Sequence, residues 1–123
     1  MISINVSLGE LYDKYTILEI KKQKIVDNKK IEMIDTELKY LKPYIDNLNL
    51  DVVLFNKLRF INKTLWDIED SIREKEKKKE FDNEFIKIAR SVYINNDIRS
   101  QIKNEINVLL KSDFVEIKSY SLY

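Results

Sequence analysis

The stretch Asp51–Arg73, which reads DVVLFNKLRFINKTLWDIEDSIR, carries the longest helical pattern in the chain. Its large aliphatic residues recur at intervals of four and three, which places them on one face of an α-helix. These residues are Leu54, Leu58, Ile61, Leu65, Ile68 and Ile72. A second row beside them contains Phe55 and the only tryptophan, Trp66. Because one helix with apolar residues on two sides contacts more than one neighbour, the pattern predicts a central helix between an N-terminal and a C-terminal layer.

Composition predicts a soluble helical protein and excludes several kinds of chemistry. The chain has 123 residues, of which 44% are hydrophobic and 35% charged, so one domain over residues 1–123 can bury a core. One glycine and one proline favour long helices with short connections. The absence of cysteine and histidine excludes disulfides, thiolate chemistry and an imidazole base. The sequence predicts no metal site and no cofactor.

Two helices are predicted before the central one. Residues 2–6 alternate apolar and polar, as in a short strand, and Ser7 and Glu10 then form a capping box. The first helix should run from about residue 8 to 27 and bury Leu11, Tyr15, Leu18 and Ile25. A second helical pattern covers residues 31–48 and should kink or break at Pro43, because proline in a helix interior is unfavourable. Together the two helices should form an antiparallel hairpin, and Asp51 should be the N-cap of the central helix.

Two further helices and an apolar tail are predicted after the central one. A break near residues 81–83 starts the fourth helix, and Asn95–Asp97 reads as a turn before a fifth. The tail from Phe114 lacks a helical period, and residues 114–117 could pair with residues 2–6 in a two-stranded ribbon. The predicted fold is therefore all-α, with about five helices and a short ribbon that joins the termini.

Charge and hydropathy bear on partners and localisation. The net charge of +1 creates no strong field toward nucleic acid or anionic membranes. No segment is apolar over a membrane-spanning length, and the N-terminus lacks a signal-peptide pattern, so the sequence predicts a cytoplasmic protein that uses no membrane. Residues 85–107 resemble a helix-turn-helix in outline, but their small excess of positive charge disfavours nucleic acid as a partner.

The candidate binding site centres on Glu69, which lies beside Trp66 at the edge of the apolar stripe. A carboxylate at the edge of a core needs a partner, and Arg90 and Arg99 in the C-terminal part are the natural ones. The group is either a structural ion pair or a site that grips a small anion. Asp67 and Glu69 point to different sides of the helix and cannot share a metal ion unaided. The candidate ligand-binding residues are Trp66, Asp67, Glu69, Arg90, Tyr93, Asn96, Asp97, Arg99, Lys103, Glu116, Lys118 and Tyr120.

Four blocks of the sequence resemble an uncharacterised family of bacterial and phage domains. The matching positions are Val6–Leu11, Asp13–Lys14, Thr16–Lys21, Leu65–Asp70, Phe85–Ile86, Ala89–Tyr93, Asn96–Asp97, Arg99, Lys103, Glu105–Asn107, Glu116 and Lys118–Tyr120. The family pattern usually has an aromatic residue at the position of Leu8. Genes of this family often lie near genes for glycosyltransferases and cell-surface polysaccharides. The resemblance implies a role in that setting but assigns no chemistry.

Three functions stay open from the sequence. The first is a small binding or adaptor protein, accessory to surface-glycan biosynthesis, that binds a protein partner or itself. A flat patch of Ile17, Ile20 and tyrosines would favour this function. The second is a small helical enzyme that uses Glu69 and arginines on an anionic metabolite, which a concave pocket would favour. The third is a nucleic-acid-binding protein of helix-turn-helix type.

Overall fold

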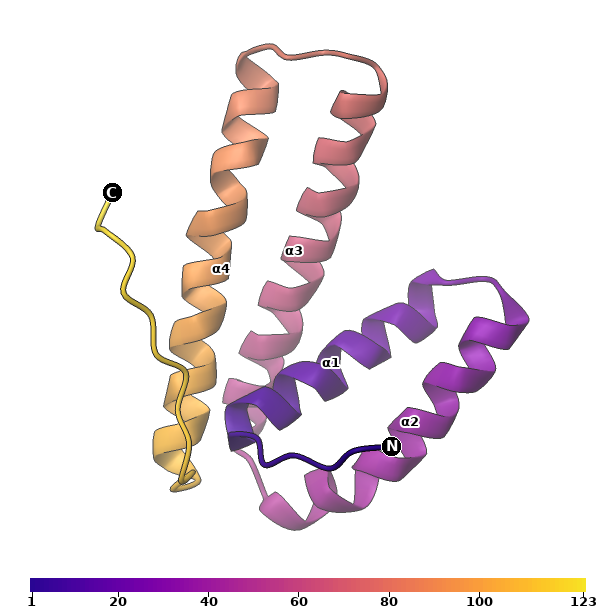
Figure 1. Ribbon diagram of the computed structural model, residues 1–123, viewed down its shortest axis with the longest axis vertical. Coiled ribbons are helices and arrows are strands. Elements are labelled where there is room, and N and C mark those ends of the chain that lie inside the picture. The colour runs from indigo at the N-terminus through magenta and orange to yellow at the C-terminus, as the bar shows by residue number, and fades with distance from the viewer.

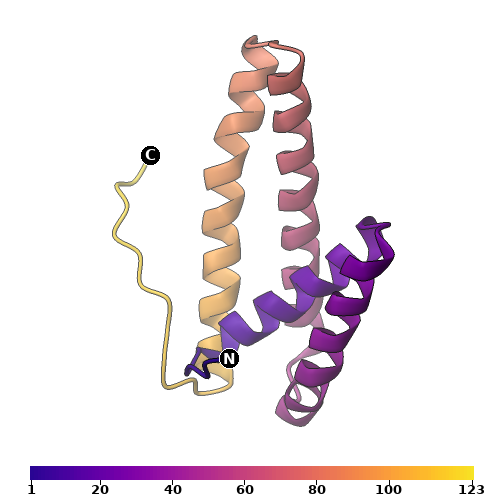
Figure 2. The same cartoon turned by 45° about the vertical axis from the view of Figure 1, so that its right-hand side comes forward.

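The computed structural model describes residues 1–123 and contains four α-helices and no β-strand (Figure 1). The helices are α1 (Leu8–Lys24), α2 (Asn28–Leu48), α3 (Val52–Lys77) and α4 (Asn83–Leu109). The last two form a long antiparallel hairpin, α1 lies across the part of it farthest from the connecting loop, and α2 packs against α1 (Figures 1 and 2). The all-α prediction and the N-terminal hairpin are confirmed. The layered arrangement is not, because α1 contacts both α3 and α4.

Each helix begins after a polar side chain that accepts a hydrogen bond from an amide in the first turn. These N-cap residues are Ser7, Asp27, Asp51 and Asp82. Such bonds satisfy amides that have no partner inside the helix. The predicted caps at Ser7 and Asp51 are confirmed. The second half of the capping box is not formed, because Glu10 bonds to Lys103 instead.

We expect Asp51→Ala to lower the free energy of unfolding by about 1 kcal/mol, as for other lost N-caps. The Asp51 carboxylate accepts from the amides of Val53, at 2.9 Å, and Leu54, at 3.2 Å. Urea denaturation would measure the loss. Asp67→Ala is the matched control, because Asp67 is exposed on the same helix and makes no side-chain bond. Equal losses for the two variants would contradict the capping role.

The hydrophobic core lies where α1, α3 and α4 meet, and one residue of α2 reaches it. Its buried members are Tyr12, Ile45, Leu54, Leu58, Ile61, Leu65, Ile102 and Ile106. The predicted stripe on α3 is thus confirmed up to Leu65. Ile68 and Ile72 are only half buried, because this part of α3 lies beyond the middle of the junction.

The predicted buried face of the first helix is confirmed only in part. Leu18 is buried as predicted, but Leu11 and Tyr15 are only partly buried and Ile25 lies just beyond the end of the helix. Besides Gly9, Tyr12, Leu18 and Ile20, the buried residues of α1 include two polar ones, Asp13 and Thr16. This happens because α1 is covered by three helices and turns a polar row toward α3 and α4.

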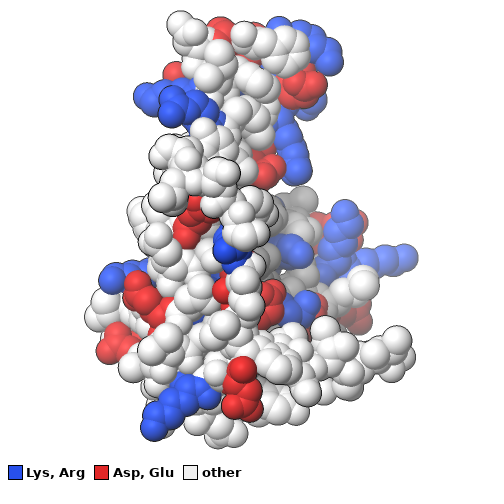
Figure 3. All heavy atoms as spheres, turned by 60° about the vertical axis from the view of Figure 1, so that its left-hand side comes forward, with Lys and Arg blue, Asp and Glu red and all other residues white.

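The predicted turn at Asn95–Asp97 is also wrong, because α4 continues unbroken through it. The Asn95 side chain donates to the Ser91 carbonyl of the same helix at 2.7 Å, so it stabilises the helix locally instead of ending it. A helix-turn-helix therefore has no basis in this segment. On the face that carries the C-terminal tail, acidic and basic side chains are interspersed (Figure 3).

The two-stranded ribbon and the break at Pro43 are not found. Residues 1–6 and 111–123 are outside regular secondary structure, and the tail runs along α4, away from the N-terminus (Figure 1). Side chains of α4 form hydrogen bonds with the tail in place of the predicted second strand. Pro43 lies inside α2, where it is exposed, so the carbonyl that loses its helical bond can reach water. No helix is both long enough and apolar enough to cross a membrane.

Candidate functional site

A buried lysine holds the centre of the junction between α1, α4 and the tail. Only 6% of the Lys103 side chain is exposed, and its ammonium group donates to Glu10 at 2.8 Å. Carboxylate oxygens of Glu116 and Asp13 lie 3.3 and 3.7 Å from the same nitrogen. The Glu116 carboxylate also accepts from Ser100 at 3.2 Å. One cation thus joins α1 and the tail to α4, and three carboxylates satisfy it.

The charged forms of Lys103 and Glu116 are stabilised by each other. Burial disfavours the Lys103 ammonium, but the bond to Glu10 and the charges of Asp13 and Glu116 outweigh it and raise its pKa above the ordinary value. Burial likewise disfavours the Glu116 carboxylate, but Lys103, Ser100 and Lys118 outweigh it and lower its pKa. Both groups therefore stay ionised near neutral pH.

The backbones of α1 and α4 approach closely beside this cluster. The Gly9 amide donates to Asn107 Oδ1 at 2.6 Å, and Asn107 is almost fully buried. A Cβ atom on Gly9 would clash with the Lys103 carbonyl oxygen. The close approach therefore requires glycine, although the backbone of Gly9 does not adopt a positive φ.

A second buried polar group links α1 to α3. The Asn62 Nδ2 atom donates to Asp13 at 2.9 Å and to Thr16 at 2.8 Å. This fixes the orientation of the amide, because the reverse orientation would place its oxygen against the Asp13 carboxylate. The Asn62 Oδ1 atom is buried and has no hydrogen-bond partner in the chain. An unpaired buried acceptor is costly and calls for a donor.

Asn62 also lines a pocket of about 310 Å³ where α1, α3 and α4 meet, which we call the junction pocket. Its walls combine a tryptophan and aliphatic side chains with two carboxylates and two arginines. The lining residues are Ile17, Asn62, Leu65, Trp66, Glu69, Asp70, Arg73, Val92, Asn96 and Arg99. Four of the candidate residues from the sequence meet here: Trp66, Glu69, Asn96 and Arg99.

The predicted contact between Glu69 and a cation of residues 90–103 is wrong. Glu69 pairs with Arg73, one turn later on α3, at 3.3 Å. Arg99 donates to Asn96 and has no carboxylate within ion-pair distance. The pocket therefore contains one paired arginine and one guanidinium without an acidic partner.

The tail forms a second hollow on the other side of Asn96, with a volume of about 420 Å³. Its lining residues are Val92, Tyr93, Asn96, Asp97, Tyr120 and Tyr123. The Tyr123 hydroxyl donates to Asp97 at 2.7 Å, and Lys118 lies 3.9 Å from the same carboxylate. Candidate residues Tyr93, Asp97, Lys118 and Tyr120 thus gather at the tail.

Two candidate residues from the sequence join neither the two hollows nor the buried cluster. Asp67 is exposed and lines none of the pockets described here. Arg90 is exposed and bonds only to the Tyr93 hydroxyl, at 3.3 Å. The remaining two, Lys103 and Glu116, belong to the buried cluster.

Several residues of the junction were not singled out as candidates from the sequence. Asp13, Thr16, Asn62 and Asn107 are polar and buried, and their partners lie far away in the chain. One signal could have found part of the set. Gly9, Asp13 and Thr16 are spaced by four and three residues, which is the spacing of a buried helix face.

The fold and the site define the class as a small all-helical protein with a polar junction pocket. No protein-family model, curated protein or solved structure matches the chain. The family resemblance noted in the sequence stays a prediction.

Proposed function

We propose that this chain is a small binding protein whose junction pocket takes a hydroxylated organic anion, such as a sugar phosphate or a sugar acid. The observation that carries the proposal is Arg99, which lines the pocket without a carboxylate partner. A guanidinium group presents its N–H donors in a planar fork that matches a carboxylate or phosphate. An anionic group of the ligand would supply the missing partner.

The other walls suit a ring that carries hydroxyl groups. Trp66 is half buried in the lining and offers a flat apolar surface. Asn62 lines the pocket, and the carboxylates of Glu69 and Asp70 are acceptors there. A volume of about 310 Å³ lies at the small end of ligand pockets, which favours a single sugar-sized compound.

The concave pocket expected of an enzyme serves ligand binding equally, and the shifted pKa values of the neighbouring buried cluster give catalysis no support. A lysine base or nucleophile needs a lowered pKa, and a carboxylic acid catalyst needs a raised one. The pKa values of Lys103 and Glu116 are shifted in the opposite directions. The flat patch that would favour an adaptor is not formed, because Ile20 is buried and Ile17 lines the pocket. The family resemblance supports an accessory role in surface-glycan biosynthesis, in which the chain binds an anionic sugar.

Fluorescence of Trp66, the only tryptophan, provides a direct test. We expect glucose 6-phosphate or glucuronate to change this fluorescence, with glucose as the uncharged control. Arg99→Gln should weaken binding of the anionic probe at least about tenfold, because it removes a charge-assisted hydrogen bond. Arg90→Gln is the matched control, since Arg90 is an exposed arginine of the same helix outside the pocket.

Two outcomes would contradict the proposal. One is that neither anionic probe changes the fluorescence. The other is that Arg90→Gln weakens binding as much as Arg99→Gln, which would indicate attraction by net charge and not by the pocket.

A further inference from the structure

The side of the α3–α4 hairpin that faces away from α1 is uncovered and carries five exposed apolar side chains. We call it the open face, and it consists of Val53, Lys57, Phe60, Ile98, Gln101, Glu105, Val108 and Leu109. Its five large apolar side chains are exposed, and Phe60 and Val108 keep 73% and 76% of their accessible surface. Apolar side chains gathered on one face in this way indicate an interface.

Two adjoining grooves of about 900 and 830 Å³ run between α3 and α4 on this face. Both are lined by Val53, Lys57, Gln101 and Glu105. Core residues such as Leu54 and Ile102 form part of the lining. No residue of α1, α2 or the tail lines either groove, so the hydrophobic core has a cover on one side only.

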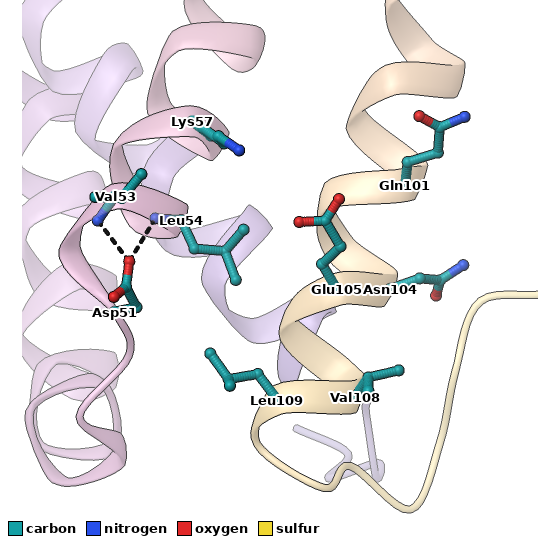
Figure 4. A pocket seen from close by; sticks show the side chains of 9 residues that line it. All are labelled: Asp51, Val53, Leu54, Lys57, Gln101, Asn104, Glu105, Val108 and Leu109. Carbon is teal, nitrogen blue, oxygen red and sulfur yellow. Dashed lines mark hydrogen bonds between the residues drawn. The ribbon is translucent and has the colours of Figure 1, made fainter.

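Three charged residues line the grooves of the open face: Asp51, whose carboxylate caps α3, and Lys57 and Glu105. Lys57 extends from α3 and Glu105 from α4, and the two helices flank the same groove (Figure 4). Neither side chain forms an ion pair within the chain. A partner that covers the face must therefore bring an anion for Lys57 and a cation for Glu105.

We propose that the partner is a second copy of this chain. On α3, the open face has the cation Lys57 between two apolar residues, Val53 and Phe60. On α4, followed from its C-terminal end, the open face has the anion Glu105 between two apolar residues, Leu109 and Ile98. Because α3 and α4 are antiparallel, the two rows run the same way along the hairpin.

A two-fold axis parallel to the hairpin brings α3 of each copy onto α4 of the other. Lys57 then faces Glu105 of the partner subunit, and the same pair forms a second time by symmetry. Val53 contacts Leu109 of the partner subunit. Phe60 contacts the helical turn with the partner's Ile98 and the partner's Gln101. The two hairpins together form a four-helix core, which covers the uncovered side of both.

Sedimentation of the full chain and of variants with reversed charges measures whether the dimer forms. We expect the wild-type chain to be a dimer. Lys57→Glu and Glu105→Lys should each weaken it at least about tenfold, because each places like charges opposite one another twice. An equal mixture of the two variants should restore a dimer, since every pair is then of opposite charge. Lys63→Glu is the control, because Lys63 is exposed on α3 outside both grooves.

Three results would overturn the proposal. They are a wild-type chain that stays monomeric at every concentration, a dimer that neither charge variant weakens, and a mixture that stays monomeric. Circular dichroism of each variant shows whether it is folded. A monomeric chain whose open face binds a helix of another protein would assign the face to a different partner and would equally refute the dimer.

Discussion

Lys103→Met is expected to lower the free energy of unfolding by about 3–5 kcal/mol, as for other buried ion pairs that lose one partner. Methionine fills nearly the same space but removes the cation that Glu10, Asp13 and Glu116 share. Asp13 is itself buried, so its carboxylate would keep only the Asn62 bond. Urea denaturation at neutral pH would measure the loss.

Lys14→Met is the matched control for this variant. Lys14 pairs with Glu37 at 2.8 Å, the same distance as Lys103 to Glu10, but 55% of its side chain is exposed. An exposed pair contributes less than about 1 kcal/mol, so burial and not distance should separate the two variants. Equal losses would show that the Lys103 cluster behaves as an ordinary surface ion pair.

The pH dependence of stability should have opposite signs in wild type and variant. The pKa of Glu116 is lowered in the folded chain, so its contribution is present above its unfolded pKa and is lost as pH falls through the folded value. In Lys103→Met, the Glu116 carboxylate loses its cation and is left beside the carboxylates of Glu10 and Asp13, so protonation of Glu116 relieves repulsion and acid should stabilise the variant. The difference between the two proteins should shrink from neutral pH to about pH 4. A difference that grows on acidification would contradict the arrangement.

The parts of the fold that followed from the sequence are those decided by local pattern. The aliphatic stripe from Leu54 to Leu65 has one period and one buried side, so the position of α3 was predictable. The caps at Ser7 and Asp51 were predictable because each side chain bonds to an amide two or three residues away. One exception was Asn95–Asp97, where a side-chain bond to the helix backbone outweighed a turn-like sequence.

Lys103 and Glu116 were among the candidates from the sequence, but the contacts that bury them were not predictable, because the other residues of the junction are polar and their partners lie far away in the chain. A row that contains Asp13 and Thr16 reads as a solvated face unless Asn62 and Lys103 are known to lie against it. Four of the candidate residues, Trp66, Glu69, Asn96 and Arg99, line one pocket together. The partner of Glu69 was wrong because Arg73 lies one helical turn away and is the nearer cation in sequence.

Gly9→Ala should destabilise the chain, by an amount in the upper part of the ~1–3 kcal/mol range seen for overpacked sites. Helix propensity alone predicts the opposite, a gain of about 1 kcal/mol, because alanine is a better helix former than glycine. The sign of the change in the free energy of unfolding therefore shows whether the clash or the helix propensity dominates. The new methyl group would clash with the Lys103 carbonyl and lie 3.0 Å from Asn107 Oδ1. A backbone atom cannot turn aside as a side chain can, so α1 and α4 must separate.

That separation would also weaken the bonds that surround Gly9. Its amide donates to Asn107 at 2.6 Å, and the next residue, Glu10, is the closest carboxylate to Lys103. Gln23→Ala is the control, because Gln23 is an exposed residue of α1 far from α4, where a better helix former should be neutral or slightly stabilising. Thermal and urea denaturation of both variants would measure the effect. A Gly9→Ala chain that is as stable as wild type, or more stable, would show that α1 and α4 do not meet at this distance.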